Sequence, residues 1–384
     1  MLLINDAITT PAFVYDEYTI QRKLRDIRKI HNCNILYPLK PCEFTEILRL
    51  MPPFIDGFSV SSLFEAMLVK DAVKDHGVVH MTTPALRPDE IEHISELCDY
   101  ISFNSLSQWK LYQGKLKSGI KQGLRINPQL SVVEDDRYNP CRQHSKLGIP
   151  LSELLHELND VNALKNISGF LFHTNCESTD FNDLLETVKH LETYIPGALS
   201  KISWINFGGG YLFDECENVE VMNEAISLLK NKYELDVFFE PGKGVIGDAG
   251  YIVSSVIDLF KSDNRSIAVL DTTVNHMPEV FEYQYKPDVA EESDNGTHKY
   301  ILAGASCLAG DIFGEYKFDL PLEIGSKLIF ENMGAYTLVK AHMFNGINLP
   351  SIYAYTIEGE LVLKRSFSYD DFKARCEVKH NVGE

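Results

Sequence analysis

The chain has 384 residues, 45% of them hydrophobic and 24% charged, which is typical of a globular protein with room for two hydrophobic cores. Its formal net charge of −19 repels phosphate backbones, so we expect no nucleic-acid partner. No apolar run approaches the roughly 18 residues of a membrane span, and the N-terminus lacks a secretory signal pattern, so we expect no membrane partner. Eight cysteines without a Cys-x-x-Cys pair predict reduced thiols, a cytoplasmic location and no metal site.

Short apolar runs alternate with amphipathic stretches from residue 12 to about residue 248. The runs predict a first strand at 12–16 and eight more at 35–39, 57–59, 78–81, 100–104, 123–127, 169–173, 204–207 and 237–240. Helical patterns lie between them at 43–51, 62–71, 88–97, 106–116, 151–158, 180–194 and 219–232. Eight strand–helix units predict an α/β fold with a (β/α)8 TIM-type barrel, and an open doubly wound sheet is the alternative.

The last third of the chain has a different character. Short β-rich segments separated by turns predict a mostly antiparallel β domain, with strands at 251–259, 267–270, 300–303, 327–330, 352–356 and 361–364. The predicted organisation is therefore an N-terminal segment at 1–25 whose strand joins the β domain, a barrel at 26–248 and a C-terminal β domain at 249–384.

Lys40 ends the apolar run at 35–39, between two prolines, where a buried strand meets a rigid turn. A lysine at that place is largely desolvated, which lowers its pKa and leaves an amine able to form a Schiff base with an aldehyde cofactor. The alternative is a lysine whose ammonium group extends out of the strand end to solvent.

Three further strand ends carry groups suited to a cofactor. Gly208–Gly210 would let the backbone approach a phosphate closely, unless the glycines form only a tight turn. Glu240 at a buried strand end needs a cationic partner, which a protonated pyridine nitrogen or a structural ion pair would supply. His173 could stack on a flat ring or transfer a proton, or could be an ordinary core histidine.

The small-residue segment 304–311 holds Cys307 and Asp311. Its small side chains permit close approach to another surface, and the Cys307 thiol can donate or accept a proton. Tyr336 could donate its hydroxyl to a phosphate. A buried inert cysteine and a packed core tyrosine are the alternatives.

The order of these groups resembles that of the fold type III, alanine racemase-like, pyridoxal-phosphate decarboxylases. It is a strand-end Lys followed by His, Gly-Gly-Gly, Glu-Pro-Gly, a Cys with a later Asp, and a Tyr. Five segments spread over most of the chain look like the carboxynorspermidine decarboxylase family, namely Asn139-Pro-Cys-Arg, Ser145-Lys-Leu-Gly, Asn206-Phe-Gly-Gly-Gly, Ser306-Cys-Leu-Ala-Gly-Asp and Phe344-Asn-Gly.

The resemblance implies a pyridoxal 5′-phosphate cofactor held by Lys40, with His173 stacked on its ring and Glu240 paired with its pyridine nitrogen. The further cofactor contacts that it implies are Gly208, Gly209, Gly210, Gly242 and Tyr336. Cys307 would protonate the carbanion left when carbon dioxide departs, while Asp311 would contact the distal amine of a small amino acid substrate and Arg142 would also lie at the substrate. In this family the Cys and Asp enter from the partner subunit, which implies a homodimer with shared active sites.

Two positions depart from the family pattern. Lys243 stands where the family usually carries a second Glu after Glu-Pro-Gly, and Asn275 where it usually carries a Glu before His-Met-Pro. Losing two acids and gaining a lysine shifts the site by roughly three charge units, and each pair interaction is worth about 1 kcal/mol or more in a pocket. We therefore favour an anionic conjugate as substrate, a citryl-diamino acid such as N-citrylornithine in siderophore biosynthesis.

Three alternatives stay open. The chain could be a carboxynorspermidine or carboxyspermidine decarboxylase of polyamine biosynthesis, with Lys243 near the cofactor phosphate, as an arginine is in related ornithine and diaminopimelate decarboxylases. The same barrel and cofactor would also support an amino acid racemase. A non-catalytic cofactor-binding protein is the third, although such proteins typically lack a C-terminal β domain.

Overall fold

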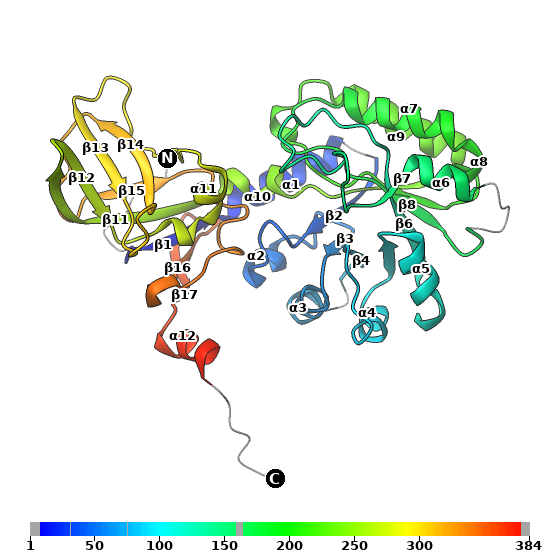
Figure 1. Ribbon diagram of the computed structural model, residues 1–384, viewed down its shortest axis with the longest axis horizontal. Coiled ribbons are helices and arrows are strands. Elements are labelled where there is room, and N and C mark those ends of the chain that lie inside the picture. The colour runs from blue at the N-terminus through cyan, green and yellow to red at the C-terminus, as the bar shows by residue number, and fades with distance from the viewer. Residues whose placement is uncertain (1–7, 31, 75, 159–163, 378–384) are drawn as a thin grey trace, which may run out of the picture. The chain divides into compact units, whose positions relative to one another are not determined.

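The computed structural model describes residues 8–30, 32–74, 76–158 and 164–377 (Figure 1). The chain divides into two compact units, one made of Met1–Ile20 with Ile246–Glu384 and the other of Gln21–Val245. We call the first the β unit and the second the barrel unit.

The described part of the barrel unit contains a closed ring of eight strands, coloured from blue to green in Figure 1. Neighbouring strands of the ring are parallel, and β5 pairs with both β4 and β6, so the sheet has no open edge. This closure confirms the predicted (β/α)8 barrel and excludes the open doubly wound sheet. The strands are β2 (Asn34–Pro38), β3 (Gly57–Val60), β4 (Val78–Thr82), β5 (Tyr100–Phe103), β6 (Lys121–Asn127), β8 (Gly169–Leu171), β9 (Trp204–Asn206) and β10 (Asp236–Phe239), while β7 (Ile149–Pro150) pairs with β6 outside the ring.

Helices follow the strands of the barrel, most of them near the predicted ranges. Serine side chains cap two of them, since Ser62 accepts the N–H of Glu65 and Ser105 accepts the N–H of Gln108. The helix predicted at 180–194 begins two residues later, because Asp180 is used outside the helix to accept the N–H of Asn182. The helices are α1 (Glu17–Ile30), α2 (Thr45–Leu50), α3 (Leu63–Val73), α4 (Ile91–Leu97), α5 (Leu106–Tyr112), α6 (Leu151–Glu157), α7 (Asn182–Tyr194), α8 (Pro196–Leu199), α9 (Val219–Tyr233) and α10 (Lys243–Ile246).

An aromatic layer fills the barrel near the amino ends of its strands. Trp204 occupies the space beside two glycines, since a Cβ on Gly123 or Gly169 would lie 2.4 or 2.0 Å from its ring. His80 stacks on Tyr100 with ring centroids 3.9 Å apart, and this layer is completed by the buried side chains of Leu36 and Phe238. Alternate residues of a strand face the same side, so the residues two and four positions further along face the interior above this layer.

The β unit is built on one mostly antiparallel sheet, coloured from yellow-green to red in Figure 1 together with the N-terminal strand β1. Strand β1 pairs antiparallel with β11 and parallel with β16. The strands are β1 (Ala12–Asp16), β11 (Gly250–Ser262), β12 (Arg265–Leu270), β13 (His298–Ala303), β14 (Ile312–Phe318), β15 (Lys327–Phe330), β16 (Ser351–Tyr355) and β17 (Leu361–Arg365), with helices α11 (Pro278–Tyr283) and α12 (Tyr369–Cys376).

Strand β14 was not among the predicted strands. Charged residues and Gly314, at φ +141°, interrupt its apolar alternation, but it pairs with β13 over its whole length. The core of the β unit includes Val14, Val253 and Tyr353, contributed by strands that are far apart in the sequence.

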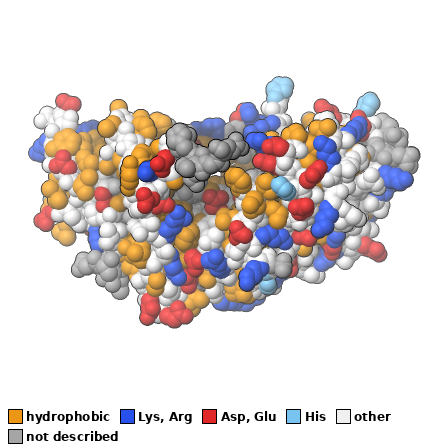
Figure 2. Space-filling view, turned by 90° about the horizontal axis from the view of Figure 1, so that it is seen from below, with side chains coloured by type: hydrophobic (Ala, Val, Ile, Leu, Met, Phe, Trp, Pro, Cys, Tyr) orange, Lys and Arg blue, Asp and Glu red, His pale blue; other side chains and the backbone are white. Residues whose placement is uncertain are grey.

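Acidic and basic side chains are interspersed on the face shown in Figure 2. In the part of the chain that the structure describes, no helix has the length and apolar character needed to cross a membrane. Within the same residues, no group of three or more His, Cys, Asp or Glu side chains is arranged to hold a metal ion.

Candidate active site

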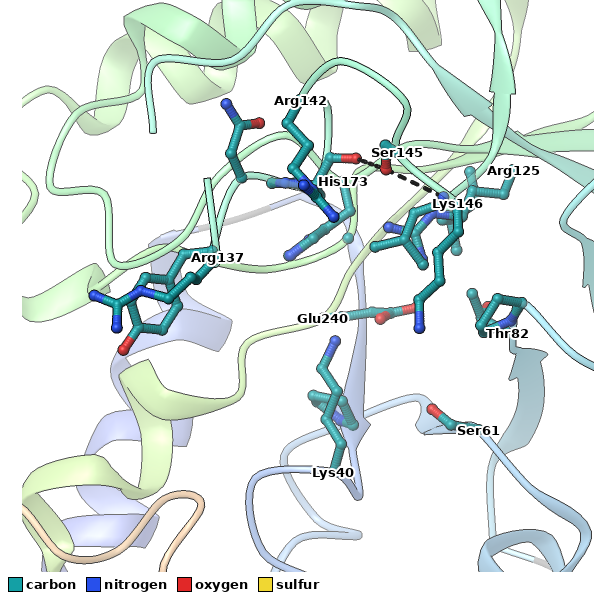
Figure 3. A pocket seen from close by; sticks show the side chains of 18 of the residues that line it. Lys40, Ser61, Thr82, Arg125, Arg137, Arg142, Ser145, Lys146, His173 and Glu240 are labelled. Atoms are coloured by element: carbon teal, nitrogen blue, oxygen red, sulfur yellow. Dashed lines mark hydrogen bonds between the residues drawn. The ribbon is translucent and has the colours of Figure 1, made fainter. Parts of the chain in front are cut away.

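A cavity of about 520 Å³ lies at the carboxyl ends of the barrel strands (Figure 3). All strands of a parallel barrel end on the same side, so residues far apart in the sequence meet there. The cavity is lined by predicted site residues of the barrel unit, namely Lys40, Arg142, His173, Gly208 and Glu240.

Lys40 follows β2 after the buried Leu39. Contrary to the prediction of a buried side chain, Lys40 is exposed, and it extends into the cavity. The surrounding protein nevertheless lowers its pKa through desolvation, an effect larger than the opposing attraction of Glu240. A larger share of the amine is therefore in the neutral, nucleophilic form than in a free lysine.

Glu240 follows β10 and is 7% exposed. Its Oε1 accepts a hydrogen bond from Nδ2 of Asn206 over 2.8 Å, and its backbone N–H donates to the carbonyl of Gly208 over 2.7 Å. The carboxylate thus has a fixed orientation at the floor of the cavity, where a cation would be favoured.

His173 lies two residues beyond β8, and its Nδ1 accepts the backbone N–H of Gly209 over 3.1 Å. Burial, followed by the charges of Lys40 and Arg125, holds the pKa of His173 well below its usual range. The ring is therefore neutral with Nδ1 as an acceptor, which suits a flat surface for stacking better than an acid.

The three glycines of Gly208–Gly210 are required by their surroundings. Gly208 has φ +68°, and a Cβ there would lie 2.6 Å from Nδ1 of His173. A Cβ on Gly209 would lie 2.1 Å from the carbonyl oxygen of Glu240. The close approach of these backbones leaves a cradle without side chains, as expected of a phosphate-binding loop.

Gly242 has a different place from the one implied. It packs against the prolines on both sides of Leu39-Lys40, where a Cβ would lie 2.7 Å from Pro41, and it does not line the cavity. Its role is to let the segment after β10 approach the segment that carries Lys40.

Arg125 is a cavity residue that the sequence analysis missed. Its Nε is buried and has no hydrogen-bond partner among the described residues, and the same holds for Thr82 Oγ1 and Ser102 Oγ on the two preceding strands. Burial lowers the pKa of Arg125, and Glu240 opposes this. The signal was present in the predicted strand 123–127, where the alternation that turns Gly123 inward also turns Arg125 inward.

The loop between β6 and β7 supplies the basic side of the cavity. Arg142 and Lys146 are exposed, line the cavity and extend toward its centre, whereas Arg137 turns toward the edge of the view (Figure 3). Arg137 is moreover paired with Asp135. The hydroxyl of Ser145 donates to the carbonyl of Pro140, which closes this loop on itself.

Lys243 is not placed as predicted. It begins α10 and forms an ion pair with Oε1 of Glu177 over 2.6 Å, and it is not a cavity-lining residue. Its charge is balanced inside the barrel unit, which removes the reason for treating it as an unpaired, anion-binding group.

The other predicted site residues belong to the β unit. Cys307 is exposed, and Tyr336 is half-buried with φ +57°. Asn275 is buried, with Nδ2 donating to Oγ1 of Thr273 over 2.8 Å. Asp311 is 2% exposed and accepts hydrogen bonds on both carboxylate oxygens. These acceptors are used within its own unit, and the predicted contact of Asp311 with the substrate stays a prediction.

The family model described as "Pyridoxal-dependent decarboxylase, C-terminal sheet domain" matches residues 12–334. The chain belongs to this family. It is a pyridoxal-phosphate-dependent decarboxylase, which is the predicted class of enzyme.

Two curated relatives match the chain over nearly its whole length. The carboxyaminopropylagmatine decarboxylase of Synechocystis sp. is 36% identical over 381 residues, which cover 96% of each chain. The carboxynorspermidine/carboxyspermidine decarboxylase of Campylobacter jejuni is 33% identical over 389 residues, which cover 96% of this chain and 99% of the relative.

Solved structures show the same fold. The carboxynorspermidine decarboxylase of Campylobacter jejuni in complex with norspermidine gives a TM-score of 0.85 at 31% identity, over 96% of this chain and all of that one. The diaminopimelate decarboxylase of Helicobacter pylori gives a TM-score of 0.84 over 96% of this chain and 97% of its own, but at 19% identity its likeness is one of fold alone.

The cavity of this decarboxylase fits pyridoxal phosphate. It offers a depressed-pKa amine on Lys40, a carboxylate on Glu240, a cradle at Gly208–Gly210 and unpartnered buried donors on Thr82 and Arg125. Pyridoxal phosphate has a matching group for each of them: an aldehyde for the amine, a pyridine nitrogen for the carboxylate, a phosphate for the cradle and a phenolic oxygen for the donors.

Proposed function

We propose that this decarboxylase removes the carboxyl group of a carboxylated polyamine. The observation that carries the proposal is the agreement among relatives that match at least 95% of the chain, whose names specify carboxyaminopropylagmatine in one case and carboxynorspermidine/carboxyspermidine in two. The structure most similar in sequence among those described above holds norspermidine, a polyamine.

The side chains around the cavity would act as follows. Lys40 holds the cofactor aldehyde, Glu240 keeps the pyridine nitrogen protonated, and His173 supports the ring. The cofactor supplies an electron sink for the electron pair that the departing carboxylate leaves behind. The cradle at Gly208–Gly210 would let the phosphate approach the backbone closely. Arg125 and Thr82 line the same cavity and would offer the cofactor their buried donors, which have no partner among the described residues.

This proposal replaces the citryl-diamino acid that the sequence favoured with the alternative substrate class. The preference for an anionic conjugate depended on Lys243 as an unpaired cation, and Glu177 balances that charge. The relatives described above are named for polyamine substrates. A role in siderophore assembly therefore has no support in the site.

The proposed working unit is a homodimer in which two subunits share each site. Cys307, the implied proton donor, is exposed on the β unit, whereas no cysteine is found among the described residues that line the cavity of the barrel unit. A donor on a second copy of the chain would complete the cavity. Mixing Lys40→Ala and Cys307→Ala chains, each of which lacks one of the two residues, should restore about a quarter of the wild-type sites if the sites are shared, and none if each chain supplies its own.

The substrate is tested by measuring carbon dioxide release by one preparation of holoenzyme. Carboxynorspermidine, carboxyspermidine, carboxyaminopropylagmatine and N-citrylornithine are compared at equal concentrations, with Lys40→Ala as the negative control. We expect turnover of at least one of the three polyamine conjugates. Turnover of N-citrylornithine alone would refute the proposal and restore the anionic substrate.

A further inference from the structure

The loop that presents Cys307 is anchored by Asp311. One oxygen of the buried Asp311 carboxylate accepts the N–H of Val274 over 2.8 Å, and the other accepts the hydroxyl of Thr273 over 2.7 Å and the N–H of Ser306 over 2.9 Å. The hydroxyl of Ser306 donates to the same oxygen. A buried carboxylate is stable only with such donors, so the loop is held to the segment that precedes α11.

The backbone of the same loop is closed at both ends. Asp311 donates its N–H to Leu308 over 2.9 Å, and its carbonyl accepts the N–H of Gly304 over 2.8 Å. Gly304 leaves the space for the carboxylate, because a Cβ there would lie 2.1 Å from Oδ1 of Asp311. The six residues between Gly304 and Asp311, among them Cys307, therefore form a short turn with fixed ends.

A second anchor holds Cys307 from outside this turn. The N–H of Cys307 donates to Oδ1 of Asn345 over 2.9 Å. Asn345 has φ +55° within the 3-10 turn Phe344–Gly346, whose own hydrogen bonds include one of 3.1 Å from Ile347 to Phe344. The backbone of Cys307 is fixed by the neighbouring Ser306 on one side and by Asn345 on the other.

An exposed thiol on so firmly held a turn is unusual. Cysteine is among the residues most often buried, and most of the cysteines described in this chain are buried or half-buried. Here the buried Asp311 and the half-buried Ser306 hold an exposed residue in place, which indicates that the position of the Cys307 Sγ matters more than its packing.

We propose that Asp311 and Asn345 are positioning residues that fix the Cys307 thiol as the proton donor of the decarboxylation. The inference rests on the proposed function, in which Cys307 protonates the carbon that has lost carbon dioxide. The thiol gives its proton to that carbon and regains one from solvent. A proton that arrives instead at the cofactor carbon leads, after addition of water, to an aldehyde product, and the amino group stays on the cofactor.

Loosening the turn should therefore change where the proton goes. In Asp311→Asn we expect kcat to fall about tenfold, because a shift of about 1 Å in a reacting group costs up to about a hundredfold. The KM should stay within about twofold, and the share of turnovers that release aldehyde should rise. Asn345→Ala should also lower kcat and raise the aldehyde share, but by a smaller factor than Asp311→Asn. Cys307→Ala should have the same two effects by a larger factor.

Asp319→Asn is the matched control, because it makes the same charge change at an exposed position just beyond the other end of β14. It should leave kcat, KM and the aldehyde share unchanged. A rise in KM for Asp311→Asn with an unchanged aldehyde share would overturn the proposal, since that result identifies a substrate contact. If circular dichroism shows that Asp311→Asn does not fold, the KM and the aldehyde share of Asn345→Ala test the proposal instead.

Alkylation separates this inference from the proposed function. In a Cys376→Ser background, which removes the other cysteine described as exposed, the rate of Cys307 alkylation by iodoacetamide is measured without substrate. Asp311→Asn and Asn345→Ala should change that rate at least threefold relative to Asp319→Asn. Equal rates would refute the positioning role even if the enzyme decarboxylates polyamines, and changed rates would support it even if the polyamine assay fails.

Discussion

Asn206 donates its side-chain N–H to Oε1 of Glu240 over 2.8 Å, while its own Oδ1 accepts the backbone N–H of Gly208 over 2.8 Å. One amide thus links the carboxylate at the floor of the cavity to the glycine cradle. Asn206→Asp replaces the donor by a second carboxylate and sets two like charges against each other. We expect the dissociation constant of pyridoxal phosphate to rise about tenfold, equivalent to about 1.4 kcal/mol.

That constant is measured by titrating the cofactor into apoprotein and following absorbance. Asn166→Asp makes the same substitution at an exposed place on the barrel unit and should leave the constant unchanged. Equal affinities of Asn206→Asp and wild type would show that this amide does not order the site.

The glycine cradle allows a second prediction. Gly209→Ala would bring a Cβ to 2.1 Å from the backbone oxygen of Glu240, and backbone atoms cannot move aside as a flexible side chain can. We expect loss of cofactor binding, seen as loss of cofactor absorbance after gel filtration, and a lower melting temperature. Gly197→Ala in α8 is the control, because no atom lies within 4 Å of the added Cβ. Retention of the cofactor by Gly209→Ala would contradict the cradle.

The basic loop before β7 should speed the arrival of the cofactor. The chain carries a net charge of −19, which repels a phosphate dianion, and Arg142 and Lys146 offset this at the cavity. Arg142→Gln with Lys146→Gln should slow pyridoxal phosphate association severalfold at low salt, by stopped-flow absorbance, and flatten its dependence on ionic strength. Lys117→Gln, just before β6 at the amino ends of the strands, should leave both unchanged. A faster dissociation with unchanged association would disprove steering, because the two side chains would then act by direct contact.

His80 should make the fold acid-sensitive. Burial holds the pKa of His80 well below its usual range, and neither ring nitrogen has a hydrogen-bond partner among the described residues. Below about pH 6.5, His80 is protonated in the unfolded chain but stays neutral in the folded chain. The free energy of unfolding therefore falls as the pH falls, by at most about 1.4 kcal/mol per pH unit.

His80→Leu removes this group while keeping an apolar side chain of similar size in the aromatic layer. Urea unfolding at pH 7 and pH 5 should show a smaller loss of stability for His80→Leu than for wild type. His93→Leu changes an exposed histidine of α4 and should behave as wild type. An unchanged pH dependence in His80→Leu would mean that other groups control acid unfolding.

The barrel and several residues of its cavity could be predicted from the sequence, because each strand and the residue at its end form one short local pattern. A short apolar run ends at Lys40, His173 or Glu240, and parallel strands bring such ends together. Arg125 could also have been found, since it alternates with Gly123 in a predicted strand. It lies within that strand, whereas the site residues were expected at the strand ends.

Contacts between distant segments could not be predicted in this way. Lys243 is neutralised by Glu177, which lies on a different loop and shares no sequence pattern with it. Asp311 accepts hydrogen bonds from Thr273 and Val274, 38 and 37 residues away, and no pattern in the sequence indicates this anchoring contact. Strand β14 is defined by its pairing with β13 more than by its own alternation.

The aromatic layer of His80, Tyr100, Trp204 and Phe238 closes the barrel beneath the cavity. Substrate, carbon dioxide and product must therefore enter and leave on the side of the carboxyl ends of the strands. A long molecule can enter only with its reacting end first, while its far end stays at the opening. Discrimination between tails of different length or charge then depends on residues at the rim, and can change during evolution without altering the chemistry at the floor.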